Sequence, residues 1–430
     1  MRKIAILGFG REGKSVLIHL RRQPAYKDAL FTVLDQRFIV PEKKAEKNVL
    51  YRLGNGYMDN LTDFDVVFRS PGVPFNLPQI QRAIKKGVKF SSETQLFFDE
   101  IKGSKATIVG ITGTKGKGTV ATLLAHMLKV AGKKVVLAGN IGKPMLSVLA
   151  QAKKADVVVL ELSSFQLQNL HASPDVAVVL HITPDHLDAH KNVAEYVGAK
   201  ASITKYQSAK DKVFYLPGNA PSAQIARRSK GKNYLVTSSV LKVGDVVLPG
   251  AHMVDNARVA ASVAVSLGCS PASIRASLKT YKPLAHRLEF VRDIKGVKFY
   301  NDSAGTNPET AVAAVKAFSQ PSILIAGGKD KGLNYAPLAK ALLDSSCKAV
   351  VLFGENKAKI AKALKMINDK VEIKIVDSLA SAVKTAVKCA HSDIHHSSFN
   401  IIFSPGSASF DMFKDYADRG EQFKKIVKKL

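Results

Sequence analysis

The chain has 430 residues, of which 46% are hydrophobic, so it is long enough for two to four domains that each bury a core. Its formal net charge of +29 would attract polyanions, but the lysines are scattered over expected helix faces, and we predict no specific nucleic-acid binding. No apolar run approaches the ~18 residues that cross a bilayer, so we expect no membrane span, and three widely spaced cysteines favour a reduced, cytoplasmic compartment.

Short β-branched runs alternate with segments of helical period along the chain, which predicts an α/β fold with mainly parallel sheets covered by helices. Polar, glycine-containing joints near Gly103 and Pro283 separate three blocks. We therefore predict domains at residues 1–103, 104–283 and 284–430. The expected strands are residues 3–7, 31–35 and 65–70 in the first block, 106–112, 155–161, 175–182 and 212–216 in the second, and 297–302, 322–328, 349–354, 372–376 and 400–404 in the third.

A glycine turn lies near the start of the first block. The stretch "GFGREG" places Gly8, Gly10 and Gly13 in a G-x-G-x-x-G pattern after an expected strand, and Asp35 ends the next strand. This pattern favours a dinucleotide or a diphosphate at a helix N-terminus. Alone it would indicate a dehydrogenase. A hydride-transfer enzyme needs no second nucleotide loop, however, and a diphosphate-bearing sugar nucleotide fits the same geometry.

The second block opens with a phosphate-binding loop, "GITGTKGKGTV", at residues 110–120. It follows an expected strand and precedes an expected helix, so Gly113 and Gly116 would let backbone N–H groups close around phosphate oxygens. Lys117 would reach the β- and γ-phosphates. Gly118 stands where such loops usually carry a hydroxyl, and Thr119 is the nearest hydroxyl available to Mg²⁺.

Polar groups follow two further strands of this block. Glu161 ends a buried strand, where a carboxylate is costly unless it is paired or metal-bound, so we predict a Mg²⁺ ligand; Ser163 and Gln166 offer hydrogen bonds to a polar ligand. The stretch "HITPDHLDAH" could form a zinc site, a capped loop, or a site in which one histidine lies beside a second Mg²⁺. Its acids and histidines are His181, Asp185, His186, Asp188 and His190.

The third block also carries polar residues at expected strand ends. Each is open to an interpretation as turn or cap chemistry, but together they indicate a site. They are Asp302, Thr306, Lys331, Ser407, Ser409 and Arg419. Because parallel sheets bind ligands at the carboxyl ends of their strands, the three blocks could share one cleft.

The order of these motifs resembles that of the Mur ligases. The resemblance covers essentially the whole chain, and its most specific pieces are "ELSSFQL" and "SPGSASFDMFKDYADRG". It implies a Rossmann-like UDP-substrate domain, a central P-loop ATPase domain and a dinucleotide-fold-like domain that binds an amino acid. The activity implied is ATP-dependent ligation of D-glutamate to UDP-N-acetylmuramoyl-L-alanine through an acyl phosphate in peptidoglycan precursor synthesis, by a cytoplasmic monomer that uses ATP and two Mg²⁺ ions.

The resemblance also implies residue roles. Lys117, Glu161, His186 and Lys200 would be catalytic, with Lys200 as a metal-bridging carbamate, although sequence physics alone gives no reason to choose that lysine. Thr119, Glu161, His186 and the Lys200 carbamate would hold the metal ions. ATP would contact Gly113, Thr114, Gly116, Lys117, Gly118, Thr119, Asn256, Arg287 and Asp302. The UDP substrate would contact Gly10, Arg11, Asp35, Ser70, Gly72, Asn140, Ser163 and Gln166, and the amino acid would contact Thr306, Lys331, Ser409 and Tyr416.

Two other functions remain open from the sequence. A folylpolyglutamate synthase is favoured by "GKGT" at residues 116–119, but a complete N-terminal glycine-loop domain suits a UDP substrate better. A nucleotide-regulated nucleic-acid-binding protein is favoured by the net charge alone.

Overall fold

A computed structural model describes residues 2–38, 47–187, 189–237, 240–241, 250–367, 370–392 and 398–430. The chain divides into two compact units: residues 1–246 with 255–281, and residues 247–254 with 282–430. The described helices include none that is long and apolar enough to cross a membrane.

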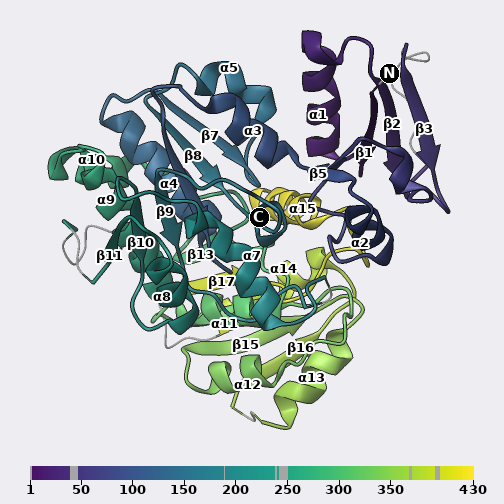
Figure 1. Cartoon of the computed structure of the whole chain (residues 1–430). Helices are drawn as coiled ribbons and strands as arrows, with labels where there is room; N and C mark the ends of the chain where they lie inside the picture. The colour runs from purple at the N-terminus through teal and green to yellow at the C-terminus, as the bar shows by residue number, and fades with distance from the viewer. Residues whose placement is uncertain are drawn as a thin grey trace. The chain divides into compact units, whose positions relative to one another are not determined.

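The first unit begins with a parallel sheet of order β3-β2-β1-β4-β5 (Figure 1). Alternate residues of its central strand face opposite sides: Ile4 and Ile6 pack with the helices α1 and α3, and Ala5 and Leu7 pack with α2. Both faces are covered, which explains why its inner strands are apolar throughout. The bounds are β1 Lys3–Leu7, α1 Arg11–Arg21, η1 Pro24–Tyr26, β2 Leu30–Asp35, β3 Val49–Leu53, η2 Leu61–Asp63, β4 Val66–Arg69, α2 Pro78–Lys85, β5 Lys89–Ser91 and α3 Glu93–Ile101.

The same unit contains a second parallel sheet, of order β11-β10-β9-β6-β8-β7. The strands β6, β8 and β9 lie at its centre, so the segments that follow them leave from one edge of the sheet. The bounds are β6 Thr107–Thr112, α4 Lys117–Val130, β7 Val135–Gly139, η3 Leu146–Val148, α5 Leu149–Ala152, β8 Val157–Glu161, α6 Ser164–Leu167, β9 Val176–Val179, α7 Val193–Lys205, β10 Lys212–Tyr215, α8 Ala220–Arg227, β11 Lys232–Leu235, α9 Ala251–Ser266 and α10 Pro271–Thr280.

One hydrophobic core joins the two sheets of the first unit. Phe97 and Phe98 of α3 belong to the same buried cluster as Leu146 of η3 and Leu149 of α5. The helix α1 also packs against η3. The first sheet is therefore packed against the second through apolar side chains.

The second unit contains a mixed sheet of order β12-β13-β17-β14-β15-β16, in which only the β12–β13 pair is antiparallel among the described strand pairs. The helices α11, α12 and α13 share a core with one face, and α14 and α15 share a core with the other. The bounds are β12 Glu289–Ile294, β13 Val297–Asn301, α11 Pro308–Lys316, β14 Ser322–Ala326, α12 Ala336–Leu343, β15 Cys347–Leu352, α13 Lys357–Lys365, β16 Glu372–Ile375, α14 Leu379–Ser392, β17 Phe399–Phe403 and α15 Tyr416–Lys428.

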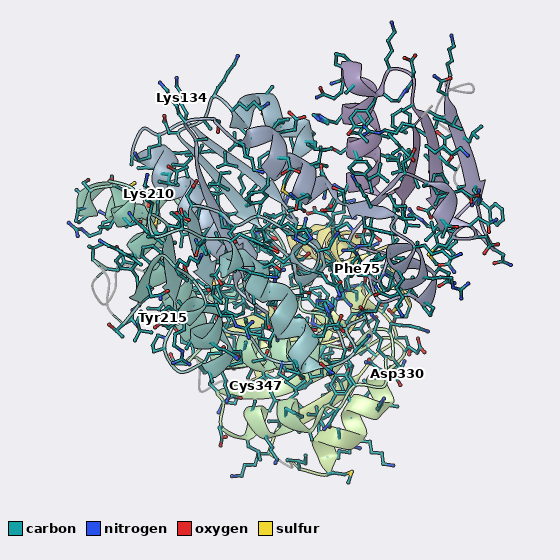
Figure 2. The ribbon with its side chains drawn as sticks, viewed as in Figure 1. Phe75, Lys134, Lys210, Tyr215, Asp330 and Cys347 are labelled. Carbon is teal, nitrogen blue, oxygen red and sulfur yellow. The ribbon has the colours of Figure 1, made fainter. Side chains whose placement is uncertain are left out.

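The lysines that produce the positive net charge include many on the surface. Lys134 and Lys210 are exposed, and Figure 2 shows their side chains beside the ribbon. Cys347, by contrast, is buried in the core of the second unit, where burial raises the pKa of its thiol to about 11. It is therefore a packing residue without thiolate character.

Candidate active site

The predicted phosphate loop connects β6 to α4 and depends on two glycines. Gly113 and Gly116 have φ angles of 149° and 86°, which disfavour other residues. A Cβ atom on Gly113 would lie 2.6 Å from Leu180 Cβ, and one on Gly116 would lie 2.6 Å from Asn256 Oδ1. The fold thus requires glycine at both positions and places Asn256, from α9, against the loop.

Lys117 is the first residue of α4 and lies over the loop. Its Nζ donates hydrogen bonds to the carbonyl oxygens of Gly113 and Thr114, at 3.0 and 2.9 Å. Gly118 and Thr119 follow in the first turn of the helix, and Thr119 is buried. The ammonium group therefore lies at the helix N-terminus, where a phosphate group would meet both the lysine and the helix dipole.

Lys200 lies beneath this loop, on α7, and its side chain is only 1% exposed. Its Nζ donates to the Gly113 carbonyl oxygen at 2.9 Å and lies 4.7 Å from the centre of the Tyr196 ring. Burial lowers the pKa of Lys200 well below its usual range, and the charge of Lys117 acts in the same direction. Burial therefore favours the neutral amine of Lys200 more than that of a lysine on the surface.

Glu161 ends β8 and pairs in the sheet with Ile111 of β6, so it lies next to the strand that leads into the loop. It is 6% exposed, and its Oε1 accepts a hydrogen bond from Asn140 Nδ2 at 2.8 Å. Asn140 directly follows β7. Glu161 is also close enough to Lys200 for its charge to oppose the lowering of the lysine pKa.

The described residues of the histidine-rich segment do not form a metal cluster of their own. Across the described ranges, which exclude Asp188, no group of three or more His, Cys, Asp or Glu side chains could hold a metal ion. His190 is buried, with Nε2 3.0 Å from Ser164 Oγ, and stacks on Phe165. His181 Nε2 lies 3.0 Å from the Pro217 carbonyl oxygen. His186 has a φ angle of 53° and lies edge-on to Phe165, its ring partly exposed.

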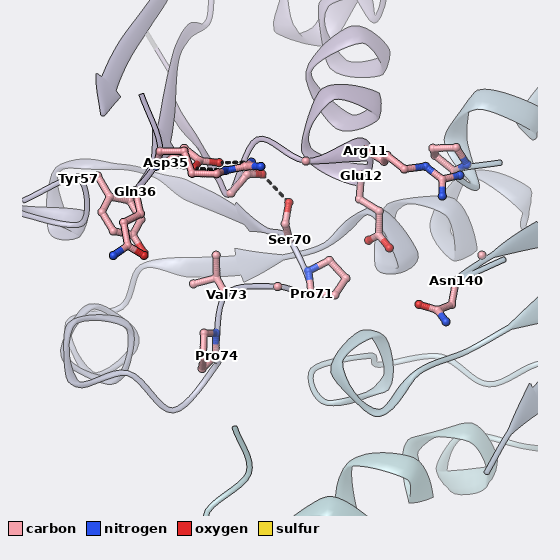
Figure 3. Close-up of a pocket in the computed structure, with 16 residues that line it drawn as sticks. Arg11, Glu12, Asp35, Gln36, Tyr57, Ser70, Pro71, Val73, Pro74 and Asn140 are labelled. Atoms are coloured by element: carbon pink, nitrogen blue, oxygen red, sulfur yellow. Dashed lines mark hydrogen bonds and ion pairs between the residues drawn. The ribbon is translucent and has the colours of Figure 1, made fainter. Parts of the chain in front are cut away.

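A second site lies at the glycine turn of the first sheet. This pocket, of about 550 Å³, has walls from the first sheet and from the segment that follows β7 (Figure 3). It brings together six of the eight residues predicted to contact a UDP substrate: Gly10, Arg11, Asp35, Ser70, Gly72 and Asn140. Arg11 also donates a hydrogen bond to the carbonyl oxygen of Gly142, in the segment that follows β7.

Asp35 keeps its charge in this pocket. Its carboxylate accepts hydrogen bonds from the Phe9 backbone N–H at 2.7 Å and from Arg37 Nε and Nη2 at 3.0 Å each. Burial tends to raise the pKa of Asp35, but the Arg37 guanidinium and the backbone donors outweigh it and lower the pKa to about 2. The acceptor capacity of Asp35 is therefore largely used within the protein.

The other two predicted substrate residues, Ser163 and Gln166, do not line the pocket. They form a capping box at the start of α6, in which Gln166 Oε1 accepts from the Ser163 backbone N–H at 2.9 Å. Gln166 Nε2 donates to Glu12 Oε1 at 2.8 Å. The orientation of the Gln166 amide is thus set by the protein.

Arg69, which was not among the predicted site residues, ties the two sheets of the first unit together. Arg69 ends β4 and is 2% exposed. It donates to the carbonyl oxygens of Val73 and Phe165, at 2.6 and 2.8 Å, and to Asn169 Oδ1 at 3.1 Å. The available signal was a charged residue at the end of the apolar run "DVVFR".

In the second unit, three strand-end loops are joined. Lys329, after β14, donates its backbone N–H to the Ala408 carbonyl oxygen at 2.9 Å. Ser303 Oγ, after β13, donates to the Tyr416 carbonyl oxygen at 2.8 Å. Of the predicted amino-acid contacts, Thr306, Lys331 and Tyr416 are exposed and Ser409 is buried.

Other polar groups of these loops are used internally. Asp302 accepts from Ser404 Oγ at 2.7 Å and from the Leu288 backbone N–H at 3.3 Å, while Arg287 is exposed. Arg419 is fully buried and donates to the carbonyl oxygens of Ser303, Ser407 and Ala408. Arg419 therefore holds loops together.

Comparison with known proteins places all three sheets in one family. Residues 2–92 match the model of the Mur ligase MurD-like N-terminal domain. Residues 111–244 match the Mur ligase middle domain, and residues 286–395 match the Mur ligase glutamate ligase domain.

Solved structures share the fold. MurC from Thermotoga maritima has a TM-score of 0.58 at 19% identity, covering 100% of this chain and 99% of its own. MurF from Acinetobacter baumannii has a TM-score of 0.61 at 15% identity, covering 98% and 90%. The folylpolyglutamate synthase of Mycobacterium tuberculosis complexed with ADP has a TM-score of 0.58 at 16% identity but covers only 78% of this chain and 93% of its own.

Curated relatives are closer in sequence. The UDP-N-acetylmuramoylalanine–D-glutamate ligase of Acetivibrio thermocellus is 38% identical, over 100% of this chain and 97% of that protein. Its counterpart from Clostridium perfringens is 37% identical, over 88% and 86%. The three domain matches and these relatives together show that the chain belongs to the Mur ligase family.

Proposed function

We propose that the chain ligates D-glutamate to UDP-N-acetylmuramoyl-L-alanine at the expense of ATP, as a step in the synthesis of peptidoglycan precursors. A carboxylate oxygen of the UDP substrate attacks the γ-phosphorus of ATP, which gives an acyl phosphate and ADP. The amine of D-glutamate, after losing a proton, attacks the acyl carbon, and inorganic phosphate leaves.

The observation that carries this proposal is the 38% identity, over the full length, to a ligase named for this reaction. The geometry is consistent with it. A pocket of about 550 Å³ at a glycine turn suits a diphosphate-bearing substrate, and a separate phosphate loop in the same unit suits ATP. A reaction with two phosphate-bearing substrates needs both sites.

Lys117 and the phosphate loop would carry the first step. The lysine ammonium and the helix N-terminus offset the negative charge of the phosphates as the carboxylate approaches. Mg²⁺ would supply further positive charge there. Two ions held by Thr119, Glu161, His186 and a carbamate on Lys200 are our proposal, because these side chains would supply the oxygen and imidazole donors.

The environment of Lys200 supports the carbamate. Carbon dioxide reacts with a neutral amine, and burial gives Lys200 a pKa well below that of a surface lysine. The free amine has no anionic oxygen to offer, whereas a carbamate converts it into an acid that suits Mg²⁺. The same buried position would therefore favour both the carbamate and its binding of Mg²⁺.

In the second unit, we assign D-glutamate binding to Thr306, Lys331, Ser409 and Tyr416. The exposed ammonium of Lys331 is suited to a side-chain carboxylate, and its Nζ lies 5.9 Å from the ring centre of Phe410, the residue after Ser409. Arg287 and Asp302 are proposed as nucleotide contacts. The domain boundaries at residues 103 and 283, the monomeric state and the cytoplasmic location stay predictions.

The test is phosphate release with purified protein and ATP. We expect release that requires both UDP-N-acetylmuramoyl-L-alanine and D-glutamate, and none with a folate substrate or RNA. Release that requires a folate and glutamate would favour the folylpolyglutamate synthase alternative, which "GKGT" still favours. Release stimulated by RNA without an amino acid would favour the nucleic-acid-binding alternative.

A further inference from the structure

Glu12 is an acidic residue in a pocket that suits an anion. It is the second residue of α1 and lines the N-terminal pocket together with Gly10, Arg11 and Asn140. Figure 3 shows its side chain extending from the start of α1 toward Pro71. The N-terminus of a helix favours negative ligands, so an ionised carboxylate here would repel the ligand that the glycine turn attracts.

The surroundings of Glu12 favour its neutral form. Its Oε1 accepts a hydrogen bond from Gln166 Nε2 at 2.8 Å, while Oε2 is buried and has no hydrogen-bond partner among the described residues. The charged groups that act on it are Glu93 of α3, Arg69 of β4 and Arg11 of α1. A buried carboxylate oxygen without a partner is costly, whereas a carboxylic acid avoids most of that cost.

The influences on the pKa of Glu12 differ in size. Burial raises the pKa of Glu12 to about 8, and the like charge of Glu93 adds to the shift. The Gln166 hydrogen bond and the charges of Arg69 and Arg11 act against it. Two arginines near one acid would ordinarily keep it ionised, so burial and Glu93 are the stronger influences here.

We propose that Glu12 determines the charge specificity of the pocket: as a neutral acid it admits the diphosphate of a UDP-linked ligand, and as a carboxylate it excludes that ligand. The proposal rests on the function proposed above for this pocket. The ionised form would put a negative charge into a poorly solvated wall beside the diphosphate, where the repulsion is only weakly screened. Ligand binding and protonation of Glu12 are then linked.

The linkage predicts a specific pH profile. With a pKa of about 8, the neutral fraction of Glu12 falls roughly tenfold between about pH 7 and about pH 9. We expect the KM for UDP-N-acetylmuramoyl-L-alanine, at saturating ATP and D-glutamate, to rise by about the same factor. Glu12→Gln carries a permanently neutral isostere, so its KM should not show this rise, whatever its value.

Glu93→Gln is the matched control. Glu93 is also buried, and burial raises its pKa to about 7, but it does not line the pocket. The rise in KM should persist in this variant and begin at a lower pH, because the like charge that helps to keep Glu12 neutral has been removed. If ionisation of Glu93 caused the alkaline rise in KM, the rise would be absent in Glu93→Gln. If ionisation of the ligand caused it, the rise would still be present in Glu12→Gln.

A measurement on the wild-type protein avoids any dependence on variants. Calorimetry with UDP, in buffers of different ionisation enthalpy, should show uptake of close to one proton on binding at about pH 9 and almost none at about pH 7. An equal rise of KM in the wild type and Glu12→Gln, a flat wild-type profile, or no proton uptake would each overturn the proposal. If neither UDP-N-acetylmuramoyl-L-alanine nor UDP bound at any pH, the proposed function of the pocket would itself be wrong.

Discussion

Replacing Arg69 tests how the two sheets of the first unit are held together. Its guanidinium makes hydrogen bonds of 2.6, 2.8 and 3.1 Å to Val73, Phe165 and Asn169, which lie in both parts of the unit. Arg69→Met keeps much of the volume but leaves these acceptors without their donor. Arg69→Lys keeps the charge but cannot reproduce the planar fork.

The magnitude follows from these contacts. A hydrogen bond to a charged group contributes about 1.5–3 kcal/mol, and breaking a buried charged network costs about 3–5 kcal/mol. Burial lowers the pKa of Arg69 to about 10, so burying this cation already costs part of the free energy that its hydrogen bonds contribute. We therefore expect Arg69→Met to destabilise the protein by the lower half of that range, about 3–4 kcal/mol. Arg69→Lys should lose about 1–2 kcal/mol, because one or two of the bonds can be kept.

Hydrogen exchange measured by mass spectrometry is the appropriate assay, because it reports on β4 and α6 separately from the second unit. A loss of about 3 kcal/mol corresponds to exchange about 100-fold faster in these segments. The control is Arg82→Ala, since Arg82 is exposed on α2 and should change protection by less than about 0.5 kcal/mol. If Arg69→Met accelerates exchange in β4 and α6 less than about fivefold, the network does not hold the sheets together.

Four further predictions concern the site and its surroundings. Lys117→Ala should reduce ATP turnover at least ~100-fold with unchanged thermal unfolding; near-wild-type ADP formation would remove the lysine from the nucleotide site. Lys200→Ala should be almost inactive and partly restored by formate or acetate, which could supply the carboxylate of a carbamate; full activity without them would contradict the carbamate. Thr119→Val should raise the Mg²⁺ concentration for half-maximal turnover, and an unchanged value would show that its hydroxyl is not a ligand. Burial raises the pKa of Glu93 from 4.5 to about 7 in the folded state, so this residue should lower the stability by about 3 kcal/mol as pH rises between these values; Glu12 adds a fall of its own, and the total fall measured by urea unfolding should be about 3 kcal/mol smaller in Glu93→Gln than in the wild type.

Most of the strands that the sequence predicted are largely buried, although β16, expected at residues 372–376, is mostly exposed. The expected strands at residues 155–161 and 400–404 became β8 and β17, because their apolar runs can only be satisfied inside a covered sheet. The strands β3, β5, β7, β11 and β12 were missed. β11 is exposed along its whole length and β12 over much of it, so their polar residues give no apolar run to recognise.

In the site, too, features set by neighbouring residues could be predicted from the sequence, whereas contacts between residues far apart in the sequence could not. The phosphate loop could be predicted because glycines with positive φ and a lysine at a helix start are local requirements. The contact between Gln166 and Glu12 could not, because these residues are 154 positions apart and meet only when two sheets share a core. Lys200 likewise became distinctive only when α7 was found to bury it beneath the Gly113 carbonyl oxygen.

The position of β17 has a consequence for how the second unit forms during synthesis. β17 lies between β13 and β14, although it begins at Phe399, long after β14 has ended at Ala326. A growing chain that has made residues 297–326 therefore holds two strands that are not neighbours in the final sheet, and each exposes an edge of unpaired backbone N–H and C=O groups until β17 arrives. We expect this interval to be the period in which nascent chains are most prone to aggregate and to need a chaperone.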